Sequence, residues 1–450
     1  MNELKELRDA ARELFDAALA AVDARRAVLR AVGFDGATLR VGDASFELRR
    51  DAPKVYSVAL GKAAASMASA LDERLGDLLV GGVLSGPPSD LKLSGRWRVY
   101  EGGHPLPNEA SVEAARASFE LLRAADDAEA LVIFLVSGGG SAMLELPRDA
   151  RVTLADLREA NRVLVSCGAP IDEVNAVRRA LSAVKGGGLA ARAPRASQVT
   201  LVVSDVASGR AFDVASGPTL AAPPDSHHVN ELVARYGLSS TLPAPILRAI
   251  EEADAHGHAQ PSEARRTFHV LLDNESACEA AVRAARERGF AVEFARDVVE
   301  QHVEAGAAEL VSRLLSLYER EGARGVCLVS GGEFSCPVRG DGAGGRNSET
   351  ALRVAFELER LFAERSTQTG LIPRHAAALC AGTDGIDGNS PADGALADET
   401  TLARVQAQGL DAQKFLDESD AYTLFKHLGD ALVTGPTGTN VRDVRILLAL

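Results

Sequence analysis

The stretch GGEFSCPVRGDGAGGRNSET (residues 331–350) organises the second half of this chain. It follows an apolar run, residues 325–330, that has the composition of a buried strand bounded by glycines. The segment 351–362 after it carries apolar residues at helical spacing. The pattern therefore predicts a strand, a glycine-rich loop and a helix, with Asn347 or Ser348 as the helix N-cap.

A loop of this kind suits an anionic ligand, because its backbone N–H groups and the positive end of the helix point toward one place. Gly344 and Gly345 let the backbone approach a ligand closely. Arg346 follows them, and its planar guanidinium suits a phosphate or a carboxylate. An ordinary hairpin turn with a surface arginine is the alternative that this stretch alone leaves open.

GDGAGG (residues 340–345) matches the dinucleotide pattern G-x-G-x-x-G. That pattern needs a second strand ending in an acidic residue about twenty positions further on. Here the chain is still within an amphipathic helical pattern, which places Glu357 and Glu359 in mid-helix. The match is therefore rejected as an NAD fingerprint.

Length and composition narrow the class of protein. A chain of 450 residues is expected to form two or three domains, and 46% hydrophobic with 25% charged residues is typical of a soluble globular protein. A net charge of −14 without a basic stripe argues against nucleic acid or a membrane surface as a partner. The five scattered cysteines favour free thiols, the amino end reads as a charged helix, and no apolar run could span a membrane. We expect a cytoplasmic protein.

The first half carries a lysine at a strand end. Residues 2–33 have one long helical pattern, and residues 37–50 alternate around Gly42-Asp43 as in a hairpin. VYSVALGKAAASMASAL (residues 55–71) then predicts a strand, a turn at Gly61 and Lys62, and a helix. Lys62 thus lies where open α/β sheets bind ligands. A surface lysine is the plainer alternative, although a cation is disfavoured at a helix start.

LVIFLVSGGGSAMLELP (residues 131–147) is the clearest ligand-loop signal of the first half. Its apolar run is typical of a central parallel strand. The loop that follows contains three glycines, which are costly in entropy for a mere turn. The residues predicted to contact a ligand here are Ser137, Gly138, Gly139, Gly140 and Ser141.

Further polar residues follow predicted helices and strands. Lys185 ends a helical segment beside three glycines, although a solvated helix charge is the usual case for such a residue. Asp205 ends the buried strand 198–205, where it could be a Mg²⁺ ligand, a proton acceptor or a turn cap. Asp384, Asp387 and Asp393 lie on a glycine loop that could bind Mg²⁺ or a polyol.

The alternation of strands and helices predicts a doubly wound first domain, residues 1–235. The proline- and serine-containing segment 221–245 is the predicted boundary region. A second α/β domain, residues 236–450, is expected to open with the strand 268–274. Both halves carry glycine loops, with Lys62 in the first half and Arg346 in the second. This combination indicates an enzyme that binds a nucleotide or a phosphate.

The chain also resembles the glycerate 2-kinase family, some members of which carry the older name hydroxypyruvate reductase. The resemblance covers nearly the whole chain and rests on eight motifs in order. These are VALGKAAASMA (58–68), SGGGSAMLELP (137–147), NAVRRALSAVKGGGLA (175–190), VVSDVASGRAFDVASGPT (202–219), SGGE (330–333), GAGGRNSETAL (342–352), AGTDGIDG (381–388) and TGPTGTNVRD (434–443). The sequence departs from the family pattern at Phe334-Ser335-Cys336 and around Asn389-Ser390 and Asp393.

The resemblance implies Mg²⁺-dependent transfer of the ATP γ-phosphate to the 2-hydroxyl of D-glycerate, giving 2-phosphoglycerate. It implies a Rossmann-like first domain, a second α/β domain and a cleft between them. The family's cleft lysine and arginine fall on Lys62 and Arg346, and Asp205 completes the expected catalytic set. From their charge, Asp205 or Asp384 is expected to hold Mg²⁺ or to accept the hydroxyl proton, and which of the two does so stays open. The expected substrate and nucleotide contacts are Ser137, Gly138, Gly139, Gly140, Ser141, Lys185, Gly332, Glu333, Gly344, Gly345, Asn347, Asp384, Asp387, Thr439 and Asn440.

Two rival functions stay open at this point. An NAD(P)H-dependent hydroxypyruvate reductase would need a nicotinamide site, for which the sequence offers no fingerprint. A non-catalytic protein that binds sugar acids would keep the loops without turning over ATP. The expected partners are a small hydroxy acid and a nucleotide, with no nucleic acid or membrane, and the oligomeric state is open, a homodimer included.

Overall fold

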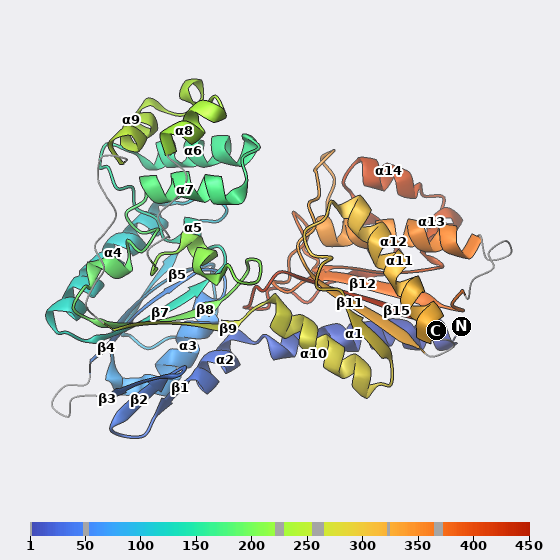
Figure 1. Cartoon of the computed structure of the whole chain (residues 1–450), viewed down its shortest axis with the longest axis horizontal. Coiled ribbons are helices and arrows are strands. Elements are labelled where there is room, and N and C mark those ends of the chain that lie inside the picture. Colours follow the sequence, from blue (N-terminus) through green and yellow to red (C-terminus); the bar gives the residue numbers. More distant parts are fainter. Residues whose placement is uncertain (1, 48–53, 221–228, 254–264, 322–324, 364–371) are drawn as a thin grey trace. The chain divides into compact units, whose positions relative to one another are not determined.

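The computed structural model of the chain describes residues 2–47, 54–220, 229–253, 265–321, 325–363 and 372–450 (Figure 1). They form two compact units. The first unit comprises Ala24–Leu271, and the second comprises Met1–Asp23 together with Leu272–Leu450. Each unit has its own six-stranded sheet, which confirms the predicted two-domain α/β class.

The division between the units corrects the predicted boundary after residue 235. Residues 221–228 of the predicted boundary region lie outside the described residues. Beyond them, α8 (Val229–Arg235) and α9 (Ala244–Ala253) bury apolar side chains in one cluster with two helices of the first unit, α6 (Leu154–Ser166) and α7 (Ile171–Leu181). Strand β9 (Arg266–Leu272), which was expected to open the second domain, is the edge strand of the first sheet. Proline and serine mark loops within a domain as well as between domains, so composition alone misplaced the boundary.

The first unit contains a doubly wound sheet with the strand order β6-β5-β4-β7-β8-β9. From β4 the chain builds outward on one side to β6, and from β7 it builds outward on the other side, as predicted. The five strands β4 to β8 pair in parallel. Their bounds are β4 Val55–Leu60, β5 Leu79–Gly86, β6 Trp97–Glu101, β7 Leu131–Ser137 and β8 Ser197–Val203.

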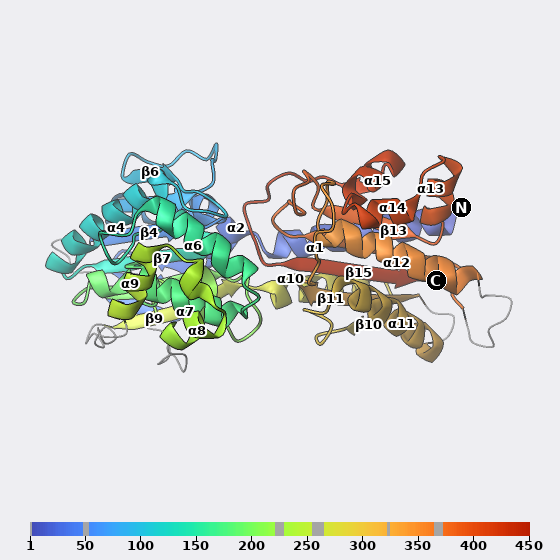
Figure 2. The ribbon, with the colours of Figure 1, turned by 90° about the horizontal axis from the view of Figure 1, so that it is seen from above.

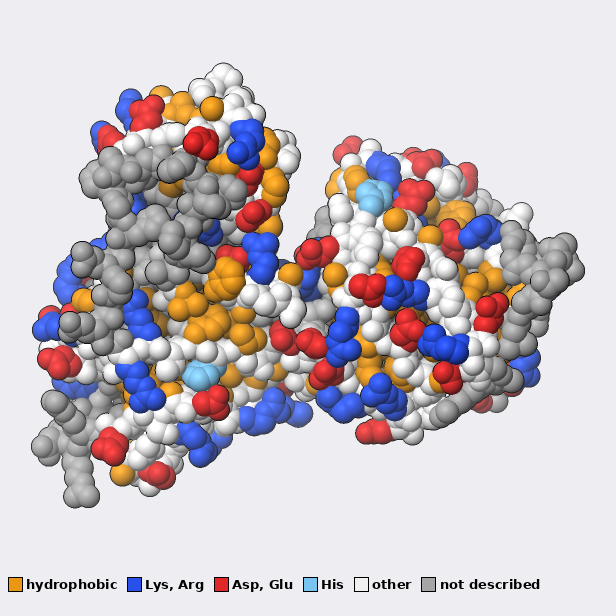
Figure 3. Space-filling model, viewed as in Figure 1, with side chains coloured by type: hydrophobic (Ala, Val, Ile, Leu, Met, Phe, Trp, Pro, Cys, Tyr) orange, Lys and Arg blue, Asp and Glu red, His pale blue; other side chains and the backbone are white. Residues whose placement is uncertain are grey.

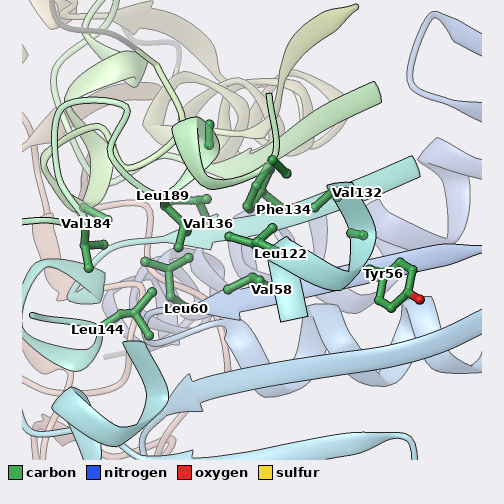
Figure 4. Packing of buried hydrophobic residues seen from close by; sticks show 14 of the residues in the cluster. Tyr56, Val58, Leu60, Leu122, Val132, Phe134, Val136, Leu144, Val184 and Leu189 are labelled. Carbon is green, nitrogen blue, oxygen red and sulfur yellow. The ribbon is translucent and has the colours of Figure 1, made fainter. Parts of the chain in front are cut away.

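Helices cover both faces of this sheet. Figure 4 shows alternate residues of β4 and β7, among them Val58 and Phe134, packed with Leu122 of α4. The residues between them, such as Ile133 and Leu135, are equally buried, so the other face is covered as well. The helices are α3 Ala64–Leu75, α4 Glu109–Asp127, α5 Gly140–Met143, α6 Leu154–Ser166 and α7 Ile171–Leu181. Short 3₁₀ turns are η1 Gly76–Leu78, η2 Ala190–Arg192, η3 Ala211–Ser216 and η4 Leu238–Ser240.

The amino-terminal segment divides where the chain passes from one unit to the other. The single helix predicted over residues 2–33 is two helices, α1 (Asn2–Ala21) and α2 (Ala24–Ala31), and only α2 belongs to the first unit. A small antiparallel sheet of β1 (Val32–Phe34), β2 (Thr38–Val41) and β3 (Ala44–Glu47) follows. Strands β2 and β3 form the predicted hairpin.

The second unit has a mixed sheet with the order β10-β11-β15-β12-β13-β14. Only β10 and β11 pair in parallel, and the other pairs are antiparallel. The last strand therefore lies at the centre of this sheet. The bounds are β10 Ala291–Phe294, β11 Val326–Gly332, β12 Ala376–Gly382, β13 Gly394–Asp398, β14 Ala431–Leu432 and β15 Asp443–Ala449.

The helices of the second unit also form two layers. In Figures 1 and 2, α11 (Val303–Glu321) and α12 (Arg346–Ala363) lie on one face of the sheet, with α1 and α10 (Asn274–Glu287) on the other. Apolar residues of α11 and α12 pack on alternate residues of β11 and β15. The remaining helices are α13 Thr401–Ala407, α14 Ala412–Asp417 and α15 Ala421–Leu428. The predicted strand, glycine loop and helix of residues 325–363 are confirmed as β11 and α12.

The surface bears charges of both signs. On the face shown in Figure 3, the described Lys and Arg side chains are interspersed with Asp and Glu. All five cysteines are free thiols. None of the helices in the described ranges has the length and apolar character needed to cross a bilayer.

Candidate active site

Lys62 lies at the point where the strand order of the first sheet reverses. Strands β4 and β7 are neighbours in the sheet although they are not consecutive in the chain. The loops after these two strands carry Lys62 and the triple glycine. In open α/β sheets, ligands bind outside the carboxyl ends of the strands at such a reversal. The two loop signals read from the first half of the sequence are thus brought together.

Hydrogen bonds tie the Lys62 turn to the triple-glycine loop. The Lys62 N–H donates to the carbonyl of Gly138 over 2.8 Å, and the Ala63 N–H donates to Ser137 Oγ over 3.0 Å. Ser137 Oγ itself donates to the Leu60 carbonyl over 3.2 Å. Gly61 has φ +107°, and a Cβ there would lie 2.3 Å from the Ser137 carbonyl oxygen. Ser137 is fully buried, so it holds the Lys62 turn in place instead of facing a ligand.

Gly140 and Ser141 of this loop contact the 3₁₀ segment η3. A Cβ on Gly140 would lie 2.8 Å from Cβ of Ala215, so a close backbone approach requires this glycine. Ser141 Oγ lies 2.8 Å from Ser216 Oγ, whose hydroxyl in turn donates to Asn175 Oδ1 over 3.3 Å. Asp205 is the second residue after the end of β8 and is half-buried.

Lys185 lies elsewhere than predicted. Its ammonium is buried, only 2% exposed, and pairs with the carboxylate of Glu145. Ser182 Oγ donates to the same carboxylate over 2.6 Å. Burial lowers the pKa of Lys185, against the opposing charge of Glu145. A ligand would reach this ammonium only by breaking a buried ion pair, so the structure gives Lys185 an internal role. Sequence reasoning missed Glu145, because a carboxylate two residues before a proline carries no motif.

In the second unit, three strands present their ends at one edge of the sheet. In the antiparallel ladders Gly332 and Gly382, the last residues of β11 and β12, both pair with Asp443, the first residue of β15. The loops that carry Glu333 and Asp384 therefore leave the sheet on either side of Asp443.

The guanidinium of Arg346 is fixed at this edge by two carboxylates. Its Nε donates to Asp443 Oδ2 over 2.6 Å, and its Nη2 donates to Asp443 Oδ1 over 3.1 Å and to Glu333 Oε1 over 2.7 Å. Nη1 makes no hydrogen bond to any residue that the structure describes. Burial works against the charge, but Asp443 and Glu333 outweigh it and raise the pKa of Arg346. The side chain is 36% exposed, so Nη1 remains available to an anionic ligand.

Asp443 is the functional candidate that sequence reasoning missed. It is 1% exposed and, besides Arg346, accepts a hydrogen bond from Asn347 Nδ2 over 3.0 Å. Arg445 Nη2 lies 3.8 Å from it. Asn274 secures the same corner by donating to the carbonyls of Val441 and Asp443. The motif TGPTGTNVRD ends on Asp443, but its position as the first residue of a central antiparallel strand was not predicted.

Asp387 occupies the start of α12, which corrects the expected N-cap. Asn347 and Ser348 lie inside the helix, and their N–H groups donate to the Asp387 carboxylate over 2.9 and 2.8 Å. Ser348 Oγ donates to it over 2.6 Å. Burial raises the pKa of Asp387 to about 6, although these hydrogen bonds oppose the shift. This carboxylate therefore occupies the anion position that the sequence suggested for a ligand. A Cβ on Gly345 would lie 2.4 Å from Asp387 Oδ1, so that glycine accommodates Asp387.

The other acidic and polar residues of this edge have mixed surroundings. Asp384 is half-buried and accepts the Ile386 N–H over 3.2 Å. Asp393 is buried against Thr434, whose hydroxyl donates to it over 2.6 Å. Thr439 Oγ1 is buried without a hydrogen-bond partner among the described residues, and Asn440 Oδ1 accepts the Arg442 N–H over 3.3 Å.

The described acidic residues could hold a metal ion together with a bound substrate, but they do not form a site in which protein side chains alone would hold it. Within the described ranges, no three His, Cys, Asp or Glu side chains are grouped so as to hold a metal ion. The predicted ligands Asp205 and Asp384 belong to different units. Mg²⁺ commonly takes only one or two protein carboxylates and completes its shell with phosphates and water. A half-buried carboxylate such as Asp384 fits that chemistry.

A cavity of about 600 Å³ opens beside Arg346 within the second unit. Its wall includes the glycine loop, Phe334, Val338 and Asp341. Glu349 also lines it, but this carboxylate is engaged by Arg339 over 3.1 Å and by Arg353 over 2.8 Å. The cavity is large enough for a ligand of the size of a nucleoside.

Comparisons with known proteins cover both units. Residues 10–251 match a family model described as a domain of unknown function, DUF4147, and residues 326–443 match the MOFRL family model. The D-glycerate 2-kinase of Thermotoga maritima is 34% identical over 87% of this chain and 90% of that protein. A relative from Agrobacterium vitis with a provisional hydroxypyruvate reductase name is 33% identical over 98% of this chain and 94% of its own length.

A solved structure agrees with this likeness. The crystal structure of glycerate kinase from Thermotoga maritima superposes with a TM-score of 0.80 at 30% identity, covering 99% of this chain and 100% of that one. The chain belongs to the glycerate kinase family, with a DUF4147 and a MOFRL domain.

Proposed function

We propose that this protein is a glycerate 2-kinase that transfers the γ-phosphate of ATP to the 2-hydroxyl of D-glycerate in the presence of Mg²⁺. The observation that carries the proposal is the nearly full-length likeness to glycerate kinases. In addition, Lys62 lies where strand β4 of the first sheet ends, and Arg346 lies at the edge of the second sheet where β11 ends. Phosphoryl transfer depends on positioning and on charge stabilisation more than on covalent chemistry by the protein.

Arg346 is proposed to hold the transferring phosphoryl group or the glycerate carboxylate through Nη1. The bonds from Nε and Nη2 to Asp443 and Glu333 fix the plane of the guanidinium before a ligand arrives. A group held in this way loses little freedom on binding, which is how preorganised charge lowers a barrier. Lys62 is proposed to supply the second positive charge, on a turn that Ser137 holds rigid.

The charges around Arg346 explain why a metal is part of the proposal. Arg346 and Arg445 are balanced by Glu333 and Asp443, so this set of four has no surplus positive charge to offer a polyphosphate. Mg²⁺, when bound, would supply that positive charge to the phosphates. Asp384 or Asp205 is proposed to hold it or to accept the proton of the 2-hydroxyl.

A rival reading as an NAD(P)H-dependent reductase has less support. The residues that a dinucleotide fingerprint would place at a strand end, Glu357 and Glu359, lie within α12. The discriminating experiment is an assay of the purified protein with ATP, Mg²⁺ and D-glycerate, run beside one with NADH and hydroxypyruvate. Glycerate-dependent release of ADP that stops when EDTA removes the metal is expected. NADH oxidation without ADP release would overturn the proposal.

A further inference from the structure

We infer that the cavity beside Arg346 binds the nucleoside part of the phosphoryl donor, with the Asp341 carboxylate accepting hydrogen bonds from the ribose hydroxyls. The inference deepens the proposed function and rests on it for the identity of the ligand as a nucleotide. It assigns the donor's nucleoside to the second unit alone, since every residue of the cavity wall lies between Phe334 and Ala421.

Size and lining favour a nucleoside over the acceptor. The cavity volume of about 600 Å³ falls in the range of small-molecule sites. This volume is far larger than that of a three-carbon acid. Apolar atoms of Phe334, Pro337, Val338 and Ala421 form part of the wall. An apolar wall offers a flat heterocycle favourable contact, but it offers nothing to the carboxylate and hydroxyls of glycerate.

The glycine loop forms a fixed wall, because its glycines face other parts of the protein. A Cβ on Gly340 or Gly342 would lie 2.7 or 2.6 Å from the carbonyl oxygen of Glu418. Asn389 clamps the loop from the other side, because its Oδ1 accepts the Gly344 N–H over 2.8 Å and its Nδ2 donates to the Gly342 carbonyl over 3.0 Å. The cavity is therefore preformed, which reduces the entropy cost of binding.

Most polar side chains of the wall are already engaged within the protein. Glu349 accepts from two arginines, Asn389 clamps the loop, and Ser419 Oγ accepts the Arg339 N–H over 2.9 Å. Asp341 is exposed and makes no hydrogen bond or ion pair with any residue that the structure describes. A free carboxylate at the rim of a nucleoside-sized cavity suits the two hydroxyls of a ribose. Arg346 also lines the cavity, and its Nη1 suits the phosphate end of the same nucleotide. The two side chains together would therefore orient the ligand.

The test uses the full-length protein and two nucleotides that differ only in the sugar. Binding of ATP and of 2′,3′-dideoxy-ATP is measured by calorimetry for the wild type and for Asp341→Ala. The wild type is expected to bind ATP at least fivefold more tightly than the dideoxy nucleotide, and Asp341→Ala is expected to bind both equally. Asp341 is exposed, so the variant should unfold at the wild-type temperature. Glu359→Ala, which removes an exposed carboxylate of α12 outside the cavity, should keep the wild-type preference.

A second measurement locates the base directly. Photolysis with 8-azido-ATP followed by peptide mapping should label residues 334–345 or 418–422. Equal sugar preferences in the wild type and Asp341→Ala, or a label confined to Ala24–Leu271, would overturn the inference even if the enzyme phosphorylates glycerate. If the variants behave as expected but no phosphoglycerate forms, the nucleoside site stands and only the proposed acceptor is rejected.

Discussion

At the scale of single residues, the proposed positive charges belong to side chains that the fold positions before a ligand binds. Arg346 is anchored by Asp443 and Glu333, and Lys62 stands on a turn whose amides are bonded to Ser137 and Gly138. Both cations could be identified from the sequence, because each follows a strand and a glycine. The anchor Asp443 could not, because it lies 97 positions from Arg346 in the chain.

Removing either cation should impair the chemical step. We predict that Lys62→Ala and Arg346→Ala each lower kcat at least ~100-fold, since preorganised charge is typically worth ~3 kcal/mol or more. Steady-state kinetics with ATP and D-glycerate would measure the effect, and Lys5→Ala, which removes an exposed lysine of α1, serves as the matched control. A folded variant that keeps near-normal turnover would remove that residue from the mechanism.

Asp443 should act through Arg346. We predict that Asp443→Asn lowers kcat at least ~10-fold, because the guanidinium loses its bidentate anchor, an effect of ~1.4 kcal/mol. A double-mutant cycle gives the specific readout. If Asp443 works by orienting Arg346, adding Asp443→Asn to Arg346→Ala should cost little more, whereas fully additive losses would argue against this role.

At the scale of elements, the glycine loop and the start of α12 are held by internal contacts. The sequence suggested that these amides bind a ligand phosphate, but Asp387 takes the N–H groups of Asn347 and Ser348. The sequence gives no sign of this, because an aspartate forty residues away caps the helix across the tertiary fold. Local capping rules apply only to residues that are neighbours in the chain.

The buried Asp387 should make stability depend on pH. Its pKa is raised to about 6 in the folded protein, above ~3.9 for an exposed aspartate. The folded state then binds the proton more tightly than the unfolded chain, so this group favours folding most at low pH, and its contribution is lost as the pH rises through that value.

Denaturant titrations at pH 7 and pH 5 would measure this dependence. When the pH is lowered from 7 to 5, the free energy of unfolding should increase by ~1 kcal/mol more in the wild type than in Asp387→Asn. Identical changes in the two proteins would contradict the assignment.

Gly345 should tolerate no side chain. Because a Cβ would meet Asp387 Oδ1 at 2.4 Å and the Gly388 N–H nitrogen at 2.5 Å, Gly345→Ala should destabilise the protein. We expect a loss of ~1–3 kcal/mol, as for other overpacked sites. Thermal unfolding would report it, with Gly95→Ala as the control, since a Cβ at Gly95 meets no atom within 4 Å. Equal melting temperatures for the two variants would show that the loop yields easily.

At the scale of the whole molecule, the second unit is built from two segments that are far apart in the chain, Met1–Asp23 and Leu272–Leu450. The first helix belongs to the second unit, where Arg8 pairs with Asp398 and Asp430. The fold class and most elements could be predicted, because they follow from local periodicity and loop chemistry. The unit boundary could not, because the pairing of β9 and the docking of α1 are long-range contacts. The predicted cleft stays a prediction.

The docking of α1 should matter for the stability of the second unit. We predict that Arg8→Ala lowers the melting temperature by several degrees, because it leaves two buried carboxylates with Arg404 as their remaining cation. Arg12→Ala, which removes a more exposed arginine of the same helix, should have little effect. Differential scanning calorimetry would compare them, and equal shifts would mean that the Arg8 contacts add nothing specific.

The position of the transferred phosphate tests the central claim most directly. After incubation with ATP, Mg²⁺ and D-glycerate, ³¹P NMR distinguishes a phosphate on the secondary carbon from one on the primary carbon. The account predicts 2-phosphoglycerate with the wild type, formed at least ~100-fold more slowly with Lys62→Ala or Arg346→Ala. Formation of 3-phosphoglycerate, or of no phosphorylated product by the folded wild type, would contradict it.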